Sequence, residues 1–241
     1  MSRTSSLRLY VISRLLLAPL MIWTITTVVF FLMRATPGDP IDALLGPRAG
    51  AEAKANLRAQ LGLDQSLPVQ YLDYMNRLFH FDLGTSLGSQ GETVWQIIVN
   101  HFPATVELTV CGMLVAATVG LTIGSIAASR PNTAFDAGGR GFGIVTYAIP
   151  MYWFGMILQI IFAVQLRWFP IGTRFPLSMN TPDGPTGLYL LDSLLNFNFA
   201  QFGTTIYHLA LPSLTLGILI SGVFERIVRV NLRQTLKADY V

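Results

Sequence analysis

The chain has 241 residues, of which 52% are hydrophobic and only 12% charged, and its formal net charge is +3. Soluble domains usually carry about 25% charged residues, so this composition excludes an ordinary soluble domain and indicates a protein embedded in lipid. A nucleic-acid-binding role is not needed to explain the net positive charge, because the charges are divided between the two sides of a membrane.

Four runs without Asp, Glu, Lys or Arg are long enough to cross a bilayer, whose hydrocarbon core needs about 20 apolar residues of helix. The first run follows Arg14 and ends before Arg34. A secretory signal is the alternative for it, but the run is longer than the usual hydrophobic region of about 7–15 residues and no small-residue cleavage pattern follows. We therefore expect it to be retained as a membrane helix. Cys111 lies inside the second run, so no disulfide framework is predicted.

The sequence thus predicts an all-α polytopic membrane protein with four transmembrane helices. Its expected segments are an N-terminal tail (1–14), span one (15–33), a long loop with short helices (34–102), span two (103–129), a turn (130–140), span three (141–166), a second loop (167–204), span four (205–224) and a terminal segment (225–241).

The distribution of basic residues predicts a cytoplasmic N-terminus. With that orientation, nine of the 16 Lys and Arg residues but only three of the 13 acidic residues fall in the three inner segments. Lys and Arg are retained preferentially on the cytoplasmic side, above all in short loops. The segments 34–102 and 167–204 are then extracytoplasmic.

The long first loop is expected to contain helices. Pro37-Gly38-Asp39-Pro40 should end the first helix and turn the chain. A helix is predicted from 51 to 61 with Gly62 at its C-terminal end, and a second begins after Ser66 with Pro68 in its first turn.

Small residues and prolines mark positions within the spans. Gly120 and Gly124 form a GxxxG step, which allows close helix packing in lipid. Pro150 and Pro212 favour kinks in spans three and four. Kinked helices suit a gated pore, but prolines also occur in membrane helices without such a role, and both interpretations stay open.

Glu107 is the acidic residue within the predicted spans. It lies close enough to the outer interface for water to reach it, so a hydrated or helix-N-terminal position is favoured over a proton relay. The glycine-rich stretch 138–143 lacks the Gly-Lys-Ser/Thr ending of a phosphate-binding loop and is interpreted as a flexible entry to span three.

Enzymatic functions are not supported by the sequence. His80, His101 and His208 are scattered and form no metal-binding pair at helical spacing, and no GxSxG motif supplies a nucleophile. We therefore predict no catalytic residue, no metal site and no cofactor bound by this chain. If transport uses ATP, another chain must hydrolyse it.

Several strings, in this order and spacing, resemble the permease subunits of dipeptide, oligopeptide and nickel ABC importers. They are Pro37-Gly38-Asp39-Pro40, Leu61-Gly62-Leu63-Asp64 with Gln70-Tyr71, Asp82-Leu83-Gly84-Thr85-Ser86, Tyr147 to Gly155, His208 to Gly217, and Arg226 and Arg229 before Leu236-Lys237-Ala238-Asp239-Tyr240-Val241.

The resemblance implies a type I ABC importer permease fold in the bacterial inner membrane, with six spans where four are present here. The final string resembles the opening of the cytoplasmic coupling loop that contacts the ATPase, so we expect the chain to lack the C-terminal part of such a permease. The implied partners are a second homologous permease forming a heterodimer, two cytoplasmic ATPases that bind ATP and Mg²⁺, an extracytoplasmic solute-binding protein and membrane lipid, but no nucleic acid.

Residue roles follow from the same resemblance. Asp39, Asp64, Tyr71 and Asp82 are expected at the outer gate or binding-protein docking surface, with a purely structural role in the loop as the alternative. The residues expected to approach the ATPase are Arg226, Arg229, Leu236, Lys237, Asp239 and Tyr240. Di- or oligopeptides are the expected substrates; nickel chelates or glutathione-like compounds, a membrane scaffold or assembly subunit without transport, and a membrane enzyme are the alternatives.

Overall fold

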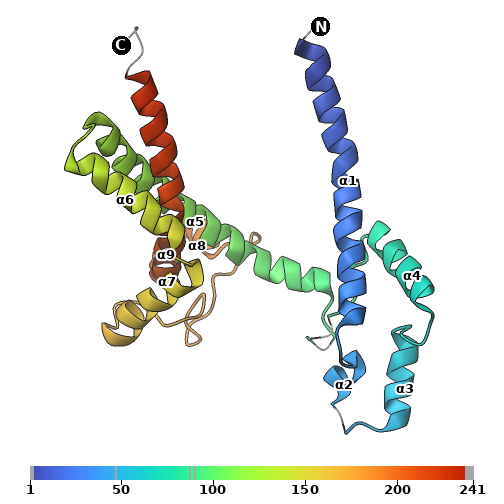
Figure 1. The fold of residues 1–241 in the computed structure, drawn as a ribbon. Coiled ribbons are helices and arrows are strands. Elements are labelled where there is room, and N and C mark those ends of the chain that lie inside the picture. The colour runs from blue at the N-terminus through green and yellow to red at the C-terminus, as the bar shows by residue number, and fades with distance from the viewer. Residues whose placement is uncertain (1–2, 47, 87, 90, 237–241) are drawn as a thin grey trace. The chain divides into compact units, whose positions relative to one another are not determined.

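The computed structural model describes residues 3–46, 48–86, 88–89 and 91–236. Helices joined by loops make up the chain, which divides into two compact units, Met1–Ile97 and Ile98–Val241 (Figure 1). Within the described residues, extended pairing is limited to an isolated bridge between Thr85 and Thr93. The predicted all-α class is confirmed.

Among its described residues, the first unit contains four complete helices: α1 (Arg3–Ala35), α2 (Pro40–Leu45), α3 (Ala51–Gln60) and α4 (Leu67–Phe79). Asp39 caps α2 by accepting a hydrogen bond from the Ile41 backbone N–H at 3.0 Å. After α3, Gly62 has φ +65° and its N–H donates to the carbonyl of Ala59. This left-handed glycine lets the chain leave α3 and turn into α4.

Helix α4 packs against the second half of α1 through an aromatic cluster. The ring of Phe30 lies 5.3 Å from that of Tyr71 and 5.5 Å from that of Tyr74. The Tyr71 hydroxyl is 2.8 Å from the Thr27 hydroxyl, and the Arg34 guanidinium lies 3.7 Å above the Phe30 ring. These contacts hold α4 on α1.

The second unit is built around two long helices, α5 (Val94–Ser129) and α9 (Phe199–Thr235). The others are α6 (Ala134–Ala148), α7 (Met151–Leu158), its π-helical continuation η1 (Gln159–Gln165) and α8 (Tyr189–Leu195). Helix α9 contacts α6, α7 and α8 (Figure 1). Small side chains dominate the core, for example Ala116 and Ala127, which are almost fully buried.

Three helices in the described part of the chain, α1 from Leu9, α5 and α9, are long and apolar enough to cross a membrane. The pair formed by α6 and α7 with η1 makes a fourth span if it is counted as one. Many large apolar side chains are exposed, such as Leu16 at 71%, as expected for a surface that faces lipid.

The helix bounds differ from the predicted segments. Helix α5 begins at Val94 and continues through Pro103, since a proline removes only one backbone hydrogen bond from a long helix. Helix α6 already begins at Ala134, in the predicted turn, and α9 extends on both sides of the predicted crossing 205–224.

The predicted third span is not one continuous helix. It breaks after Ala148, and the two parts meet at an angle of 101°. Ile149 and Pro150 have extended backbone angles, and Pro150 caps α7. Because proline disfavours a helical conformation in the residue before it, the break falls at this dipeptide.

Candidate functional site

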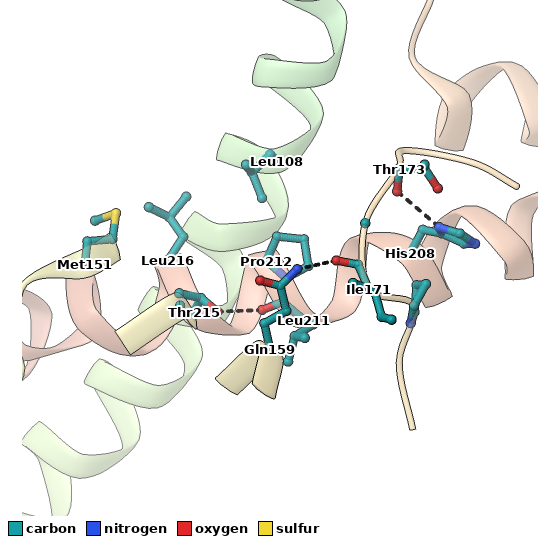
Figure 2. A pocket seen from close by; sticks show the side chains of 13 residues that line it. Leu108, Met151, Gln159, Ile171, Thr173, His208, Leu211, Pro212, Thr215 and Leu216 are labelled. Atoms are coloured by element: carbon teal, nitrogen blue, oxygen red, sulfur yellow. Dashed lines mark hydrogen bonds between the residues drawn. The ribbon is translucent and has the colours of Figure 1, made fainter. Parts of the chain in front are cut away.

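A pocket of about 420 Å³ lies in the second unit between α5, α7, η1, α9 and the segment 170–173 (Figure 2). Its wall is mostly apolar, and polar atoms reach it from Gln159, Thr173, His208 and Thr215. No charged side chain is among its described lining residues. The wall therefore offers apolar contact and hydrogen bonds to a solute, but no ion pair.

Residues 170–174, here called the strap, form one edge of this pocket. The Gln159 side-chain amide donates to the carbonyl of Ile171, and His208 Nδ1 donates to the carbonyl of Thr173 at 3.1 Å (Figure 2). Thr173 has φ +66°, which is unfavourable for a β-branched residue. Contacts from both η1 and α9 thus hold the strap in a strained conformation.

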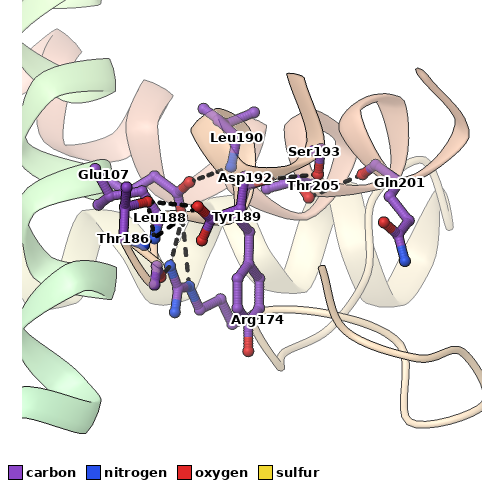
Figure 3. A network of polar contacts seen from close by, with 11 residues as sticks. Glu107, Arg174, Thr186, Leu188, Tyr189, Leu190, Asp192, Ser193, Gln201 and Thr205 are labelled. Carbon is purple, nitrogen blue, oxygen red and sulfur yellow. Dashed lines mark hydrogen bonds and ion pairs between the residues drawn. The ribbon is translucent and has the colours of Figure 1, made fainter. Parts of the chain in front are cut away.

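The strap ends at Arg174, whose guanidinium is bound to α5 (Figure 3). Its Nη2 lies 2.9 Å from Glu107 Oε2 and donates to the Gly187 carbonyl at 2.7 Å. The guanidinium also lies 3.6 Å above the Tyr189 ring, and the Leu190 N–H donates to Glu107 Oε1 at 2.6 Å. Glu107 is only 5% exposed. The prediction of a hydrated Glu107 is therefore wrong, because the loop after η1 folds over it.

A second buried acid, Asp192, organises the same loop (Figure 3). Its Oδ1 accepts hydrogen bonds from the Thr186 hydroxyl at 2.7 Å and the Thr186 N–H at 3.3 Å. The Thr186 hydroxyl also accepts from the Leu188 N–H. The segment between η1 and α9 is therefore a folded structure with its own polar interior.

Helices α5 and α9 approach each other closely at the predicted small-residue step. A Cβ atom on Gly120 would lie 2.6 Å from the Ser221 carbonyl oxygen, and one on Gly124 would lie 2.8 Å from the Glu225 carbonyl oxygen. Gly217 makes the reciprocal approach from α9 to α5. At these positions side chains larger than glycine have no room.

The glycine-rich stretch 138–143 is part of α6, so the prediction of a flexible entry is wrong. A Cβ atom on Gly139 would lie 3.1 Å from Glu225 Oε1, and one on Gly143 would lie 3.0 Å from Glu225 Oε2. These two glycines make room on α6 for a buried carboxylate of α9. The stretch is helical because this close packing compensates for the low helix propensity of glycine.

Five charged side chains join α6 and α9, and we call them the α6–α9 charge cluster: Asp136, Arg140, Glu225, Arg229 and Arg233. Asp136 and Glu225 are fully buried. Arg229 Nε donates to Glu225 Oε1 at 2.7 Å. Asp136 lies 2.6 Å from Arg233, 3.5 Å from Arg140 and 4.0 Å from Arg229. Two acids are thus surrounded by three bases.

The closest pair of the cluster is Asp136 with Arg233, whose Oδ1 and Nη2 atoms are 2.6 Å apart. At this distance the two opposite charges attract each other strongly.

A second cavity, of about 890 Å³, lies beside this cluster between α6 and α9. Its charged lining residues are Arg140, Glu225, Arg226 and Arg229, and large apolar side chains such as Tyr147 and Val223 line much of the rest. Helix α9 therefore borders both cavities.

The residues expected to approach an ATPase lie in different surroundings. Arg226 is exposed, whereas Arg229 is 15% exposed and bound inside the charge cluster. Leu236 caps the C-terminal end of α9 and is half exposed. Lys237, Asp239 and Tyr240 lie outside the described residues.

Three of the four residues expected at the outer gate make contacts within the first unit. Asp39 caps α2 and pairs with Arg58, Tyr71 joins α4 to α1, and Asp82 accepts a hydrogen bond from a backbone N–H two residues on. Asp64 is exposed. These contacts support the structural alternative for Asp39, Tyr71 and Asp82, while a docking role stays a prediction.

Sequence reasoning missed Asp136, Arg174, Asp192 and Arg233. The spacing of Glu225, Arg229 and Arg233, four residues apart on one helix, was a usable signal for a charged face. Arg174 had no such signal, because its partner Glu107 is 67 residues away in the sequence.

The apolar helices, the bent helix pair and the solute-sized pocket define a multi-pass membrane protein. Two family matches then identify it more closely. Residues 7–109 match the N-terminal part of membrane components of binding-protein-dependent transport systems, and residues 120–241 match the binding-protein-dependent transport system inner membrane component. The chain belongs to this family of inner-membrane transport proteins.

Relatives with assigned names are peptide permeases. The di/tripeptide transport system permease protein of Pseudomonas aeruginosa is 37% identical over 218 residues, which cover 90% of this chain and 64% of that protein. The dipeptide transport system permease protein of Alkalihalophilus pseudofirmus is 33% identical over 236 residues, covering 96% of this chain and 69% of that protein. The chain thus spans about two thirds of the length of these relatives.

Proposed function

We propose that this chain is a permease subunit of an ATP-driven importer and forms half of a translocation path for di- or oligopeptides. The observation that carries this proposal is the similarity to named di- and tripeptide permeases, which extends over at least 90% of the chain. The alternatives of a scaffold, a nickel-chelate importer or a glutathione importer have no comparable support.

The family's dependence on a binding protein supports the expected partners. We expect an extracytoplasmic binding protein that delivers peptide, a second homologous permease and two cytoplasmic ATPases. ATP and Mg²⁺ are expected on those ATPases, and this chain is expected to bind no cofactor. The peptide crosses by alternating access, in which ATP binding and hydrolysis bias an outward-open and an inward-open state.

The pocket between α5, α7 and α9 supports a place on this path. Its uncharged wall suits weak contact with a peptide backbone and with varied side chains, as a passage requires. The break at Pro150 directs α7 toward this pocket, and the strap covers one edge of it. A change in the angle between α6 and α7 would alter access to the pocket.

Affinity purification of the full-length natural gene product in mild detergent tests the proposal, with mass spectrometry of its partners. We expect two ATPases and a second permease to co-purify, and the reconstituted complex with its binding protein to take up labelled di- and tripeptides on addition of ATP. Purification of the protein without ATPases would contradict the proposal and favour the scaffold. Uptake of nickel chelates or glutathione instead of peptides would contradict the substrate class.

A further inference from the structure

The α6–α9 charge cluster ties the last turns of α9 to the first turn of α6. Glu225, Arg229 and Arg233 follow each other at intervals of four residues, so they share one face of α9. Arg233 and Arg229 both approach Asp136, at 2.6 Å and 4.0 Å. Arginines from two successive turns of α9 therefore meet one carboxylate of α6.

Burial makes this connection strong. Asp136 and Glu225 are fully buried, and Arg229 is only 15% exposed. Breaking a buried ion pair is strongly unfavourable, because it leaves an uncompensated charge. Gly139 and Gly143 add to this by letting α6 lie directly on the Glu225 carboxylate. The end of α9 and the beginning of α6 are thus expected to move as one body.

The cluster also lies between the C-terminal end of α9 and the helix that leads to the pocket. Arg233 lies two residues before the end of α9 at Thr235. At its other end, α6 leads to the 101° break and to α7, which borders the 420 Å³ pocket. Contacts therefore run from the last turn of α9 through Asp136 to α6, and α6 leads to the bend beside the pocket.

We propose that Asp136 is a positioning residue which, together with Arg229 and Arg233, transmits movement of the last turn of α9 to α6 and thereby couples an ATPase partner to the pocket. This inference rests on the proposed importer function. It assigns Arg229 to a linkage inside the chain, whereas the sequence suggested direct contact with the ATPase.

The test uses the full-length protein, assembled with its partner subunits and reconstituted in liposomes. Uptake of a radiolabelled mixture of di- and tripeptides and hydrolysis of ATP are measured on the same vesicles. In Asp136→Asn we expect the complex to hydrolyse ATP, while the amount of peptide taken up per ATP falls about tenfold. Asp136→Glu restores the charge and is expected to recover part of the ratio.

Arg233→Gln is a second, milder variant, because this side chain is 28% exposed and Asp136 keeps two other bases. It is expected to lower the same ratio. Arg130→Gln is the matched control: Arg130 is exposed near the start of α6 and contacts Phe135 instead of the cluster. Its ratio of peptide to ATP is expected to equal that of the wild type.

An unchanged ratio in Arg233→Gln overturns the inference, even where Asp136→Asn fails to assemble. A reduced ratio in Arg130→Gln of the same size also overturns it, because the effect would then not be specific to the cluster. Absence of peptide uptake by the wild-type complex is a different result, which refutes the proposed function itself.

Discussion

Glu107 and Asp136 are buried carboxylates, and each is paired with an arginine that is distant in the sequence. A buried charge without a partner is strongly unfavourable, so each arginine fixes the position of the segment that carries it. Arg174 fixes the strap and the loop after η1 on α5, and Arg233 fixes the end of α9 on α6. These pairs connect the loops and helix ends to the apolar core.

The Glu107 pair leads to a stability prediction. Glu107→Gln is expected to destabilise the protein by about 3 kcal/mol, because the half-buried Arg174 guanidinium loses its buried charged partner. Thermal unfolding of the purified protein in detergent measures this change. Glu92→Gln, at an exposed position, is the matched control and should leave the melting temperature unchanged. Equal melting temperatures of Glu107→Gln and wild type would contradict the importance of the pair.

Substitutions of Asp39 can distinguish a structural role of this residue in the loop from a role in docking the binding protein. Asp39→Ala removes the cap of α2 and is expected to cost about 1 kcal/mol, whereas Asp39→Asn keeps a capping oxygen and should cost less. Protease sensitivity of the segment 40–60 is the measurement. If both variants stay as resistant as wild type but lose binding-protein-stimulated ATP hydrolysis, the docking role is correct and the structural one is not.

At the scale of helices, the packing of α5 on α9 depends on glycines, which have no side chain to keep the two backbones apart. Membrane helices have no hydrophobic driving force for association in lipid, so close van der Waals contact between their backbones takes its place. The sequence indicated the step at Gly120 and Gly124 from their spacing alone. It did not indicate the contact of Gly139 and Gly143 with Glu225, because that contact depends on how α6 is placed against α9.

The glycines of this packing lead to a matched pair of substitutions. Gly124→Leu would force α5 and α9 apart and is expected to cost about 1–3 kcal/mol or more and to lower the yield of assembled protein. Gly141→Ala meets no atom within 4 Å and should stabilise α6 by about 0.5–1 kcal/mol through helix propensity. Size-exclusion yield and thermal unfolding give both results. Wild-type assembly of Gly124→Leu would refute the packing role.

The broken third span shows what local sequence information can and cannot predict. Pro150 indicated an interruption, because proline lacks a backbone N–H and restricts the residue before it. The 101° angle between the two parts did not follow from the sequence, since the direction of α7 depends on its contacts with α9. The helical character of 134–140 was also missed, because the glycines there masked the start of α6.

For the whole molecule, the orientation in the membrane is the main untested prediction. Fusions of alkaline phosphatase, which is active only outside the cytoplasm, to the full-length protein report the side of each loop. We expect a fusion after residue 135 to be inactive and one after residue 180 to be active, because the basic residues favour a cytoplasmic N-terminus. The reverse pattern of activities would show that the orientation is inverted.

The sequence by itself determined the fold class, the apolar helices and the family, because these depend on composition, on lengths of apolar runs and on ordered local strings. Only the tertiary structure decided which charges meet, where the pocket lies and how the third span bends. Pairs such as Glu107 with Arg174 and Asp136 with Arg233 join residues that are 67 and 97 positions apart. Such distances are bridged by helix packing, and no local pattern in the sequence encodes them.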